Sequence, residues 1–141
     1  MKKTFLKTLT FILLTMTVYN ACKPKEDCEA GGDGALTLMV KLQHHGVTIY
    51  NQPTYKDTVY FVFNTQEAPA LNSNLIPVRY DKMIVGTGTE DHVHVTNMKC
   101  GNYYIYAAGL DTAGPYRVTG GIPFSTEETT GEISVIVPVT E

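Results

Sequence analysis

The sequence predicts an all-β protein whose folded part is a single antiparallel β-sandwich of seven or eight strands. Short runs in which apolar and polar residues alternate recur along the chain. The segments between these runs are rich in Gly, Pro, Asn and Asp, which are turn-forming residues. No long stretch shows the 3.6-residue period of an amphipathic helix. We therefore expect one domain over residues 35–141.

The expected strands cover residues 35–43, 47–50, 58–64, 78–85, 92–97, 103–110, 116–124 and 132–139. In the first of them, Leu or Val alternates with polar or flexible residues from Leu36 onward, which indicates one buried face. A turn at His44-His45-Gly46 leads into the second strand. That strand ends before Pro53, because proline cannot donate to a β-ladder.

The third strand carries apolar residues on both faces. Val59 and Phe61 would face the core, while Tyr60 and Val62 would face the other side. This pattern indicates a central strand that is at least partly covered on both faces. The loop over residues 65–77 is long, and long loops are functional or mobile. A fourth strand follows this loop and ends at a turn-rich break over residues 86–91.

The last four strands follow the same period of two. In the fifth, Val93 and Val95 point to the core, so His92 and His94 point outward. The sixth places Tyr103, Ile105 and Ala107 on one face and Tyr104, Tyr106 and Ala108 on the other. The seventh contains Gly120-Gly121, which suggests a bulge or a close backbone approach. Pro138 suits the eighth to an edge of a sheet.

The leader covers residues 1–21 and has the three parts of a secretory signal peptide. Three lysines give a positive start, an apolar run follows as far as Val18, and small residues precede Cys22. The apolar run is shorter than the roughly 20 residues that span a bilayer. This order resembles bacterial lipoprotein signals, in which the cysteine after the cleavage point receives diacylglycerol. Cys22 is the expected lipidation site; an ordinary signal peptide followed by a chance cysteine is the alternative.

Residues 22–34 are expected to form a flexible tether, because they mix charges with Gly and Pro. Lys23 is not the Asp that retains enteric lipoproteins in the inner membrane, which favours the outer membrane. Lys25-Glu26-Asp27 resembles the surface-export signal of some Gram-negative lipoproteins, and a solvated tether explains the same residues equally well. We expect a lipid-anchored protein of the outer membrane and leave its exposure at the cell surface open.

The charge balance of the chain is acidic. The whole chain has 11 basic and 14 acidic residues, and loss of the three leader lysines leaves 8 against 14, a net charge of −6. This balance disfavours nucleic acid as a partner, since phosphate backbones bind Lys and Arg. The membrane, through the lipid anchor, and a protein or a glycan remain as partners.

If Cys22 carries lipid, Cys28 and Cys100 remain as a pair. Compartments outside the cytoplasm permit disulfides. A bridge that closes a loop of this length would stabilise the fold by about 4 kcal/mol on the chain-entropy account. The alternative is a free Cys28 in the tether and a free Cys100 in a turn. The spacing of the three cysteines does not match a zinc signature.

Residues 98–111 are similar to the G-x-Y-x-hydrophobic strand of transthyretin-like (prealbumin-like) and carboxypeptidase-regulatory-like domains. Residues 43–49 are similar to the early strand, Gly turn and short strand of these domains, and with residues 119–123 they resemble small lipoproteins of one Gram-negative group. The resemblance covers about residues 35–140. It implies an Ig-like or prealbumin-like sandwich, with a Gly at the turn and a Tyr at the corner. It also implies roles in adhesion, support of a neighbouring domain or carbohydrate uptake, although a fold alone does not fix a function.

Two histidines are candidate metal ligands. His92 and His94 share a strand face, with alpha carbons about 7 Å apart, and His44 or His45 would supply a third ligand if the first strand lies nearby. Glu90 and Asp91 would then orient an imidazole. The alternative is ordinary solvent-facing polarity, which we favour. No structural metal and no cofactor is therefore expected.

The sequence contains no pattern that is typical of an enzyme. Ser73, Ser125 and Ser134 lie in no G-x-S-x-G motif, and neither an H-E-x-x-H motif nor a phosphate loop occurs. We expect a non-catalytic binding or structural module of the cell envelope. The alternatives are a metal-binding accessory domain that uses His92 and His94, or a glycan-binding module of an uptake system.

The tyrosines give candidate binding residues. Tyr104 and Tyr106 share a face, and Tyr116 lies on an expected neighbouring strand. Exposed aromatic patches bind sugars or proteins. The alternative is that a sheet, loop or helix covers this face.

Overall fold

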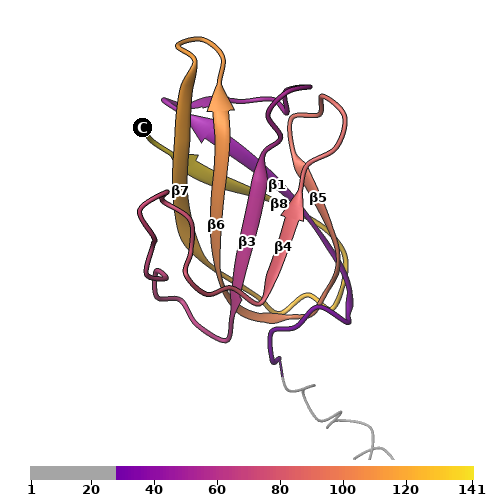
Figure 1. The fold of residues 1–141 in the computed structure, drawn as a ribbon. Helices are drawn as coiled ribbons and strands as arrows, with labels where there is room; N and C mark the ends of the chain where they lie inside the picture. Colours follow the sequence, from indigo (N-terminus) through magenta and orange to yellow (C-terminus); the bar gives the residue numbers. More distant parts are fainter. Residues whose placement is uncertain (1–27) are drawn as a thin grey trace, which may run out of the picture.

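The structure, a computed structural model, describes residues 28–141, which form two four-stranded sheets packed face to face (Figure 1). The all-β sandwich predicted from the sequence is confirmed. The signal peptide at 1–21, the lipidation site at Cys22 and residues 23–27 lie outside the described residues. Within 28–141 there is no helix that is long and apolar enough to cross a membrane. The strands are β1 (Ala35–His44), β2 (Val47–Thr48), β3 (Thr58–Phe63), β4 (Lys82–Val85), β5 (Val93–Met98), β6 (Gly101–Asp111), β7 (Tyr116–Thr126) and β8 (Thr130–Val139).

The first sheet, which we call sheet A, is organised around β1. β8 pairs with β1 in parallel over its whole length, from Ala35 opposite Thr130 to His44 opposite Val139. The antiparallel partners β5 and β2 therefore share the other edge of β1, β5 along its first half and β2 at its end. Because β8 pairs with no other named strand, Pro138 stands on an edge strand as predicted.

The second sheet, sheet B, has the order β4-β3-β6-β7, and all its pairs are antiparallel. β3 lies between β4 and β6, which confirms the central position predicted from its two apolar faces. β6 and β7 pair without interruption over 11 residues each, from Gly101 opposite Thr126 to Asp111 opposite Tyr116. Gly120 leaves no room for a side chain, because an added Cβ would lie 2.2 Å from the Pro138 carbonyl oxygen on β8.

The core lies between the sheets and follows the predicted alternation of each strand. The apolar inward-facing side chains of β1 and β5 are at most 1% exposed, and so are those of β6 from Tyr103 to Ala107. Burial of one such Leu or Val stabilises the fold by about 1.5–3 kcal/mol relative to an exposed position. The fully buried core side chains with the largest volumes are Tyr103, Phe61, Leu36, Leu38, Leu42, Met98 and Ile105.

The largest difference from the predicted elements concerns the fourth strand. It was expected over residues 78–85, but β4 begins only at Lys82. Val78 instead donates its backbone N–H to Ala70 within the loop, at 2.8 Å, and Asp81 donates to Phe61 at 2.8 Å. The preceding residue, Pro77, forms an isolated bridge with Leu71. The alternation of residues 78–81 therefore belongs to a loop that folds back on itself.

The N-terminal segment is held against the sandwich from Cys28 on, which corrects the expected start of the folded body at residue 35. Cys28 forms a disulfide with Cys100, with alpha carbons 5.0 Å apart. Ala30 is buried and its N–H donates to Asn64 Oδ1 at 2.9 Å. The Tyr103 hydroxyl donates to the Lys99 carbonyl at 2.7 Å, so this tyrosine ties down the corner between β5 and β6.

Candidate functional site

The outer face of sheet B carries a group of tyrosines that the β3–β4 loop partly covers. Tyr60 pairs with Tyr106 across β3 and β6, with ring centroids 6.4 Å apart. The ring of Tyr80, from the loop, packs edge-on against Tyr60 at 5.1 Å. The Tyr106 hydroxyl donates to the carbonyl of Leu75 at 2.9 Å. Tyr60 and Tyr106 are therefore buried on the outer face of a sheet, where burial raises the pKa of Tyr60.

The predicted patch of Tyr104, Tyr106 and Tyr116 does not form. Tyr104 is half-buried, Tyr106 is buried under the loop, and Tyr116 is exposed. Tyr116 pairs with Asp111, whereas Tyr106 pairs with Gly121, five residues along β7. Because an odd number of residues separates the two positions, Tyr116 leaves sheet B on the opposite face. The sequence analysis left open that a sheet, loop or helix covers this face, and in the structure a loop covers Tyr106.

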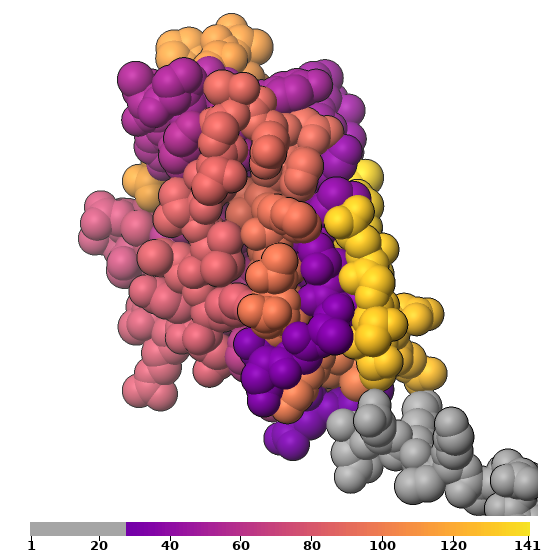
Figure 2. Space-filling view, turned by 90° about the vertical axis from the view of Figure 1, so that its right-hand side faces the viewer, coloured from indigo at the N-terminus to yellow at the C-terminus, as the bar shows by residue number. Residues whose placement is uncertain are grey.

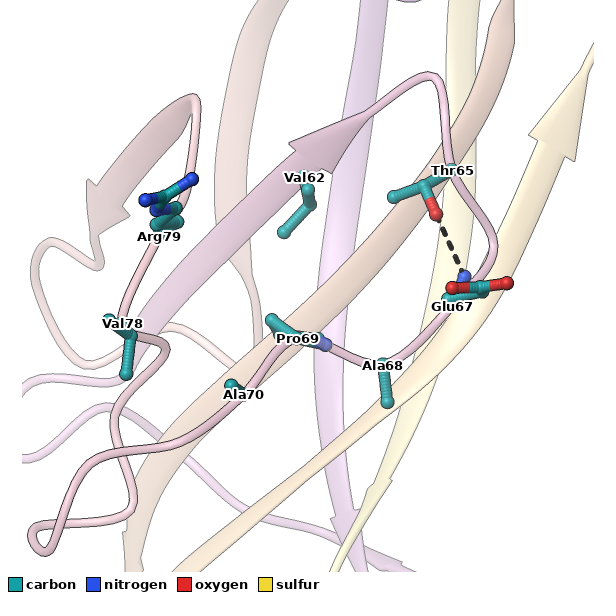
Figure 3. Close-up of a pocket in the computed structure, with 8 residues that line it drawn as sticks. All are labelled: Val62, Thr65, Glu67, Ala68, Pro69, Ala70, Val78 and Arg79. Atoms are coloured by element: carbon teal, nitrogen blue, oxygen red, sulfur yellow. Dashed lines mark hydrogen bonds between the residues drawn. The ribbon is translucent and has the colours of Figure 1, made fainter.

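A shallow pocket of about 320 Å³ lies between the outer face of β3 and the loop. Figure 3 shows Val62 of β3 between Arg79 on one side and Thr65 and Glu67 on the other. The backbone N–H of Glu67 donates to Thr65 Oγ1 at 3.0 Å, which shapes the first turn of the loop. The remaining lining residues are small or apolar: Ala68, Pro69, Ala70 and Val78. The pocket is thus apolar inside, with a cationic and an anionic side chain in its wall.

Exposed apolar side chains are concentrated near this pocket. Of the ten large hydrophobic residues that are exposed among the described residues, six fall within the 15 residues from Leu71 to Val85. These six are Leu71, Leu75, Val78, Tyr80, Met83 and Val85. In Figure 2, which looks onto the β4–β5 edge, this part of the chain forms the side of the molecule away from β8. Such a concentration on one side of a small domain is typical of an interaction surface.

The outer face of sheet A has the opposite character. Lys41 lies 2.7 Å from Asp91, which also accepts from His92 Nδ1 at 2.8 Å. The hydrogen bond from His92, followed by the one from Lys41, lowers the pKa of the Asp91 carboxyl. His94 lies 3.6 Å from Glu132 on the far side of β1. Charged and polar pairs that face water therefore cover this sheet.

His92 and His94 point outward, as predicted, and Val93 and Val95 between them are fully buried. Their ring centroids lie 6.0 Å apart. The expected third ligand does not reach them, because the one grouping of three candidate ligands among residues 28–141 contains neither His92 nor His94. His44 stands on the inward-facing register of β1, whereas His94 lies opposite Met39 on the outward-facing register. The sequence hypothesis of a site built from His92, His94 and a histidine of the first turn is thus not supported by the geometry.

His44 is a residue whose place the sequence prediction missed. It was assigned to a turn, but it is the last residue of β1 and its side chain is only 3% exposed. Its Nδ1 lies 2.7 Å from Asp111 Oδ2 at the end of β6. The hydrogen bond from His44, followed by that from the Ala113 N–H, lowers the pKa of the Asp111 carboxyl. The alternation Leu36, Leu38, Val40, Leu42 was the available signal, since its next inward position is 44.

Around His44 lies the end of the sandwich that we call the distal pole, formed by His44, His45, Asp111 and Glu141. β1, β6 and β8 all run toward this end, whereas Cys28 lies at the other (Figure 1). His44, His45 and Glu141 each offer one metal-ligating atom here, and these atoms lie within 4.8 Å of one another. It is the one such grouping of three among residues 28–141.

Asp57, just before β3, is a second buried polar residue near this end. It is 1% exposed, and its Oδ1 has no hydrogen-bond partner among the described residues. Asn51 fixes its backbone, because Asn51 Oδ1 accepts from the Asp57 N–H at 3.0 Å. Close packing surrounds the carboxyl: a Cβ added to Gly109 would lie 2.6 Å from Asp57 Oδ1. Burial raises the pKa of Asp57 from 3.8 to about 6, against a smaller opposing effect of Lys56.

Comparison of this chain with models of protein families, with curated proteins and with solved structures gives no match.

Proposed function

We propose that this protein is a membrane-tethered, non-catalytic binding module of the outer membrane that holds a protein partner against the outer face of sheet B. The observation that carries the proposal is the concentration of exposed apolar side chains between Leu71 and Val85. The outer face of sheet A, with its paired charges, offers no comparable surface among the described residues. The two faces of one small sandwich therefore differ in what they can bind.

The chemistry of this surface favours a protein over a sugar. Interfaces between proteins are enriched in aromatic residues, Met and Arg and depleted in Lys and Glu. Tyr80, Met83 and Arg79 lie within five residues of one another on this surface. The pocket beside Val62 would accept an apolar side chain of the partner, and Arg79 in its wall would pair with a carboxylate.

The tether supports the same proposal. An extended chain advances about 3.5 Å per residue, so the six steps from Cys22 to Cys28 span at most about 20 Å. A diacylglycerol on Cys22 would therefore hold the sandwich close to the bilayer, with its first described residue at the end nearer the membrane. The outer face of sheet B would then stand beside the membrane rather than against it. A partner in this position is another protein of the envelope.

Site-specific photo-crosslinking in intact cells tests the proposal. The full chain carries p-benzoylphenylalanine in place of Tyr80, and a matched control carries it in place of Ile136 on the outer face of sheet A. The two side chains are similarly exposed, 45% and 51%. We expect a discrete protein adduct from position 80 that is missing from position 136.

The same adduct from both positions would overturn the proposed face, since it would report proximity alone. No protein adduct from position 80 would overturn the protein partner. If purified wild-type protein then bound a soluble envelope glycan and the Tyr80→Ser variant did not, the face would be a glycan site instead.

A further inference from the structure

We propose that His44, His45 and Glu141 form a binding site for a divalent transition-metal cation such as Zn²⁺ at the distal pole. This site is separate from the outer face of sheet B and does not depend on the function proposed above. Two imidazole nitrogens and one carboxylate oxygen are ligands that Zn²⁺ takes in proteins. The three side chains already bring their ligand atoms within 4.8 Å of one another.

The fold explains why residues so far apart in the sequence converge. His44 and Val139 are direct partners in the parallel pair of β1 and β8. Glu141 follows Val139 by two residues, so its side chain leaves the backbone on the same side. The chain end is fixed by two hydrogen bonds between Thr140 and Thr119 of β7, at 2.8 and 2.9 Å. Glu141 is therefore held beside the end of β1.

His45 reaches the same point through the turn between β1 and β2. It has a positive φ of 48°, and Gly46 after it has a φ of 81°. A positive φ is uncommon for a residue other than Gly. This conformation places the His45 ring 4.1 Å from the His44 ring, measured between centroids. One ligand is thus buried and fixed, and the two others are exposed and free to adjust.

Asp111 acts as a positioning residue for His44. Its Oδ2 lies 2.7 Å from His44 Nδ1, which orients the imidazole ring. An ionised carboxylate only accepts hydrogen bonds, so His44 Nδ1 carries the proton of the 2.7 Å bond. Because Asp111 engages Nδ1, Nε2 is the ring nitrogen of His44 that remains for a metal. A carboxylate that holds a ligating histidine in this way is a common feature of zinc sites.

The spacing requires only small movements. With bonds of about 2.0–2.1 Å, tetrahedral geometry places neighbouring ligand atoms about 3.4 Å apart. His45 and Glu141 therefore need to approach His44 by about 1.4 Å at most, which exposed side chains achieve by rotation about their χ angles. A hollow of about 550 Å³ adjoins the two histidines and Asp111. Three protein ligands, two of which border this hollow, leave a fourth position for water or for a small ligand.

Isothermal titration of the metal-stripped full chain with ZnCl₂ at pH 7.5 tests the site. We expect one Zn²⁺ per chain in the wild type. His45→Ala and Glu141→Gln alter exposed side chains and should leave the fold intact, and each should weaken binding at least about tenfold. Asp111→Asn should weaken it by about 10–100-fold, as is usual for partners of ligating histidines. The matched control is the double variant His92→Ala/His94→Ala, which should bind as the wild type does.

Three results would overturn the inference. The first is that the wild type does not bind Zn²⁺ with a Kd below about 100 μM. The second is that His45→Ala and Glu141→Gln leave binding unchanged. The third is that the His92→Ala/His94→Ala control abolishes binding. The role of Asp111 has its own readout in the ¹⁵N resonances of the His44 ring without metal. Asp111→Asn should raise the fraction of His44 protonated on Nε2. An unchanged tautomer ratio would refute the positioning role.

Discussion

Asp57 gives the sharpest test of the structure, because its carboxyl is buried and one of its oxygens has no partner among the described residues. Burial raises its pKa from 3.8 to about 6 in the folded protein. The folded state therefore binds this proton more tightly than the unfolded state does. The resulting stability is fully present below about pH 3.8 and is lost as the pH rises through about 6.

The magnitude follows from the same two values. Each pH unit between the folded and unfolded pKa corresponds to 1.36 kcal/mol. The difference between 3.8 and about 6 thus means that ionised Asp57 costs about 3 kcal/mol of folding free energy at pH 7.5. We expect Asp57→Asn to remove this pH-dependent cost. The buried amide of the variant also lacks some hydrogen bonds, which lowers its free energy of unfolding by about 1–3 kcal/mol. This loss does not vary with pH.

The quantity to measure is therefore the change with pH in the effect of Asp57→Asn. Urea unfolding of the wild type and the variant at pH 4.0, 5.0, 6.0 and 7.5 gives the free energy of unfolding of each. Relative to the wild type, the variant should gain about 2.4 kcal/mol between pH 4.0 and pH 7.5, because about 0.6 kcal/mol of the full effect is already lost at pH 4.0. Packing and hydrogen-bond differences cancel in this comparison because they are the same at each pH.

Asp33→Asn is the matched control, with a trend of opposite sign. Asp33 is exposed, and its hydrogen bond with Lys99 lowers its pKa. Its contribution is present above its unfolded pKa and is lost as the pH falls, so Asp33→Asn should show a small effect that shrinks toward low pH. If the effect of Asp57→Asn did not change between pH 4.0 and pH 7.5, the Asp57 carboxyl would not be buried as the structure places it.

Three further predictions concern the cysteines and the outward histidines. The Cys28–Cys100 bridge closes a loop with a sequence separation of 72, so its reduction should cost about 4 kcal/mol of stability; mass analysis should find these two thiols alkylated only after reduction, and alkylation without reduction would contradict the pairing. Cys22→Ala should move the protein from the membrane to the soluble fraction, and a wild type that incorporates no labelled lipid would refute lipidation. His92→Thr/His94→Thr should change the free energy of unfolding by less than about 0.5 kcal/mol for each substitution. A larger loss of stability would show that these residues hold a structural metal. So would a chelator that lowers the melting temperature of the wild type but not that of the double variant.

The strands could be predicted from the sequence because alternation is a local property. Val93 and Val95 are fully buried and Tyr103, Ile105 and Ala107 face the core, as their spacing indicates. The parallel pairing of β1 with β8 could not be predicted in this way. Alternation shows that each segment is a strand, but neither sequence contains a signal that identifies the other strand as its partner. Residues 78–81 show the limit of alternation itself, because a loop that bonds to itself satisfies the same pattern.

The distal pole shows why sites are harder to predict than strands. Continuing the alternation of β1 by one step would have placed His44 inward. The sequence could therefore have predicted the burial of His44, although not the identity of its partner. Asp111 becomes its partner only because the end of β6 in one sheet packs over the end of β1 in the other, 67 residues away. Glu141 depends in turn on the parallel register that sets Val139 beside His44. Each of these contacts depends on a pairing between segments that are far apart in the sequence, and the hydrophobic period of a strand does not determine such a pairing. A polar residue at the next inward position of a strongly alternating strand is therefore the useful signal, because a buried polar group requires a partner.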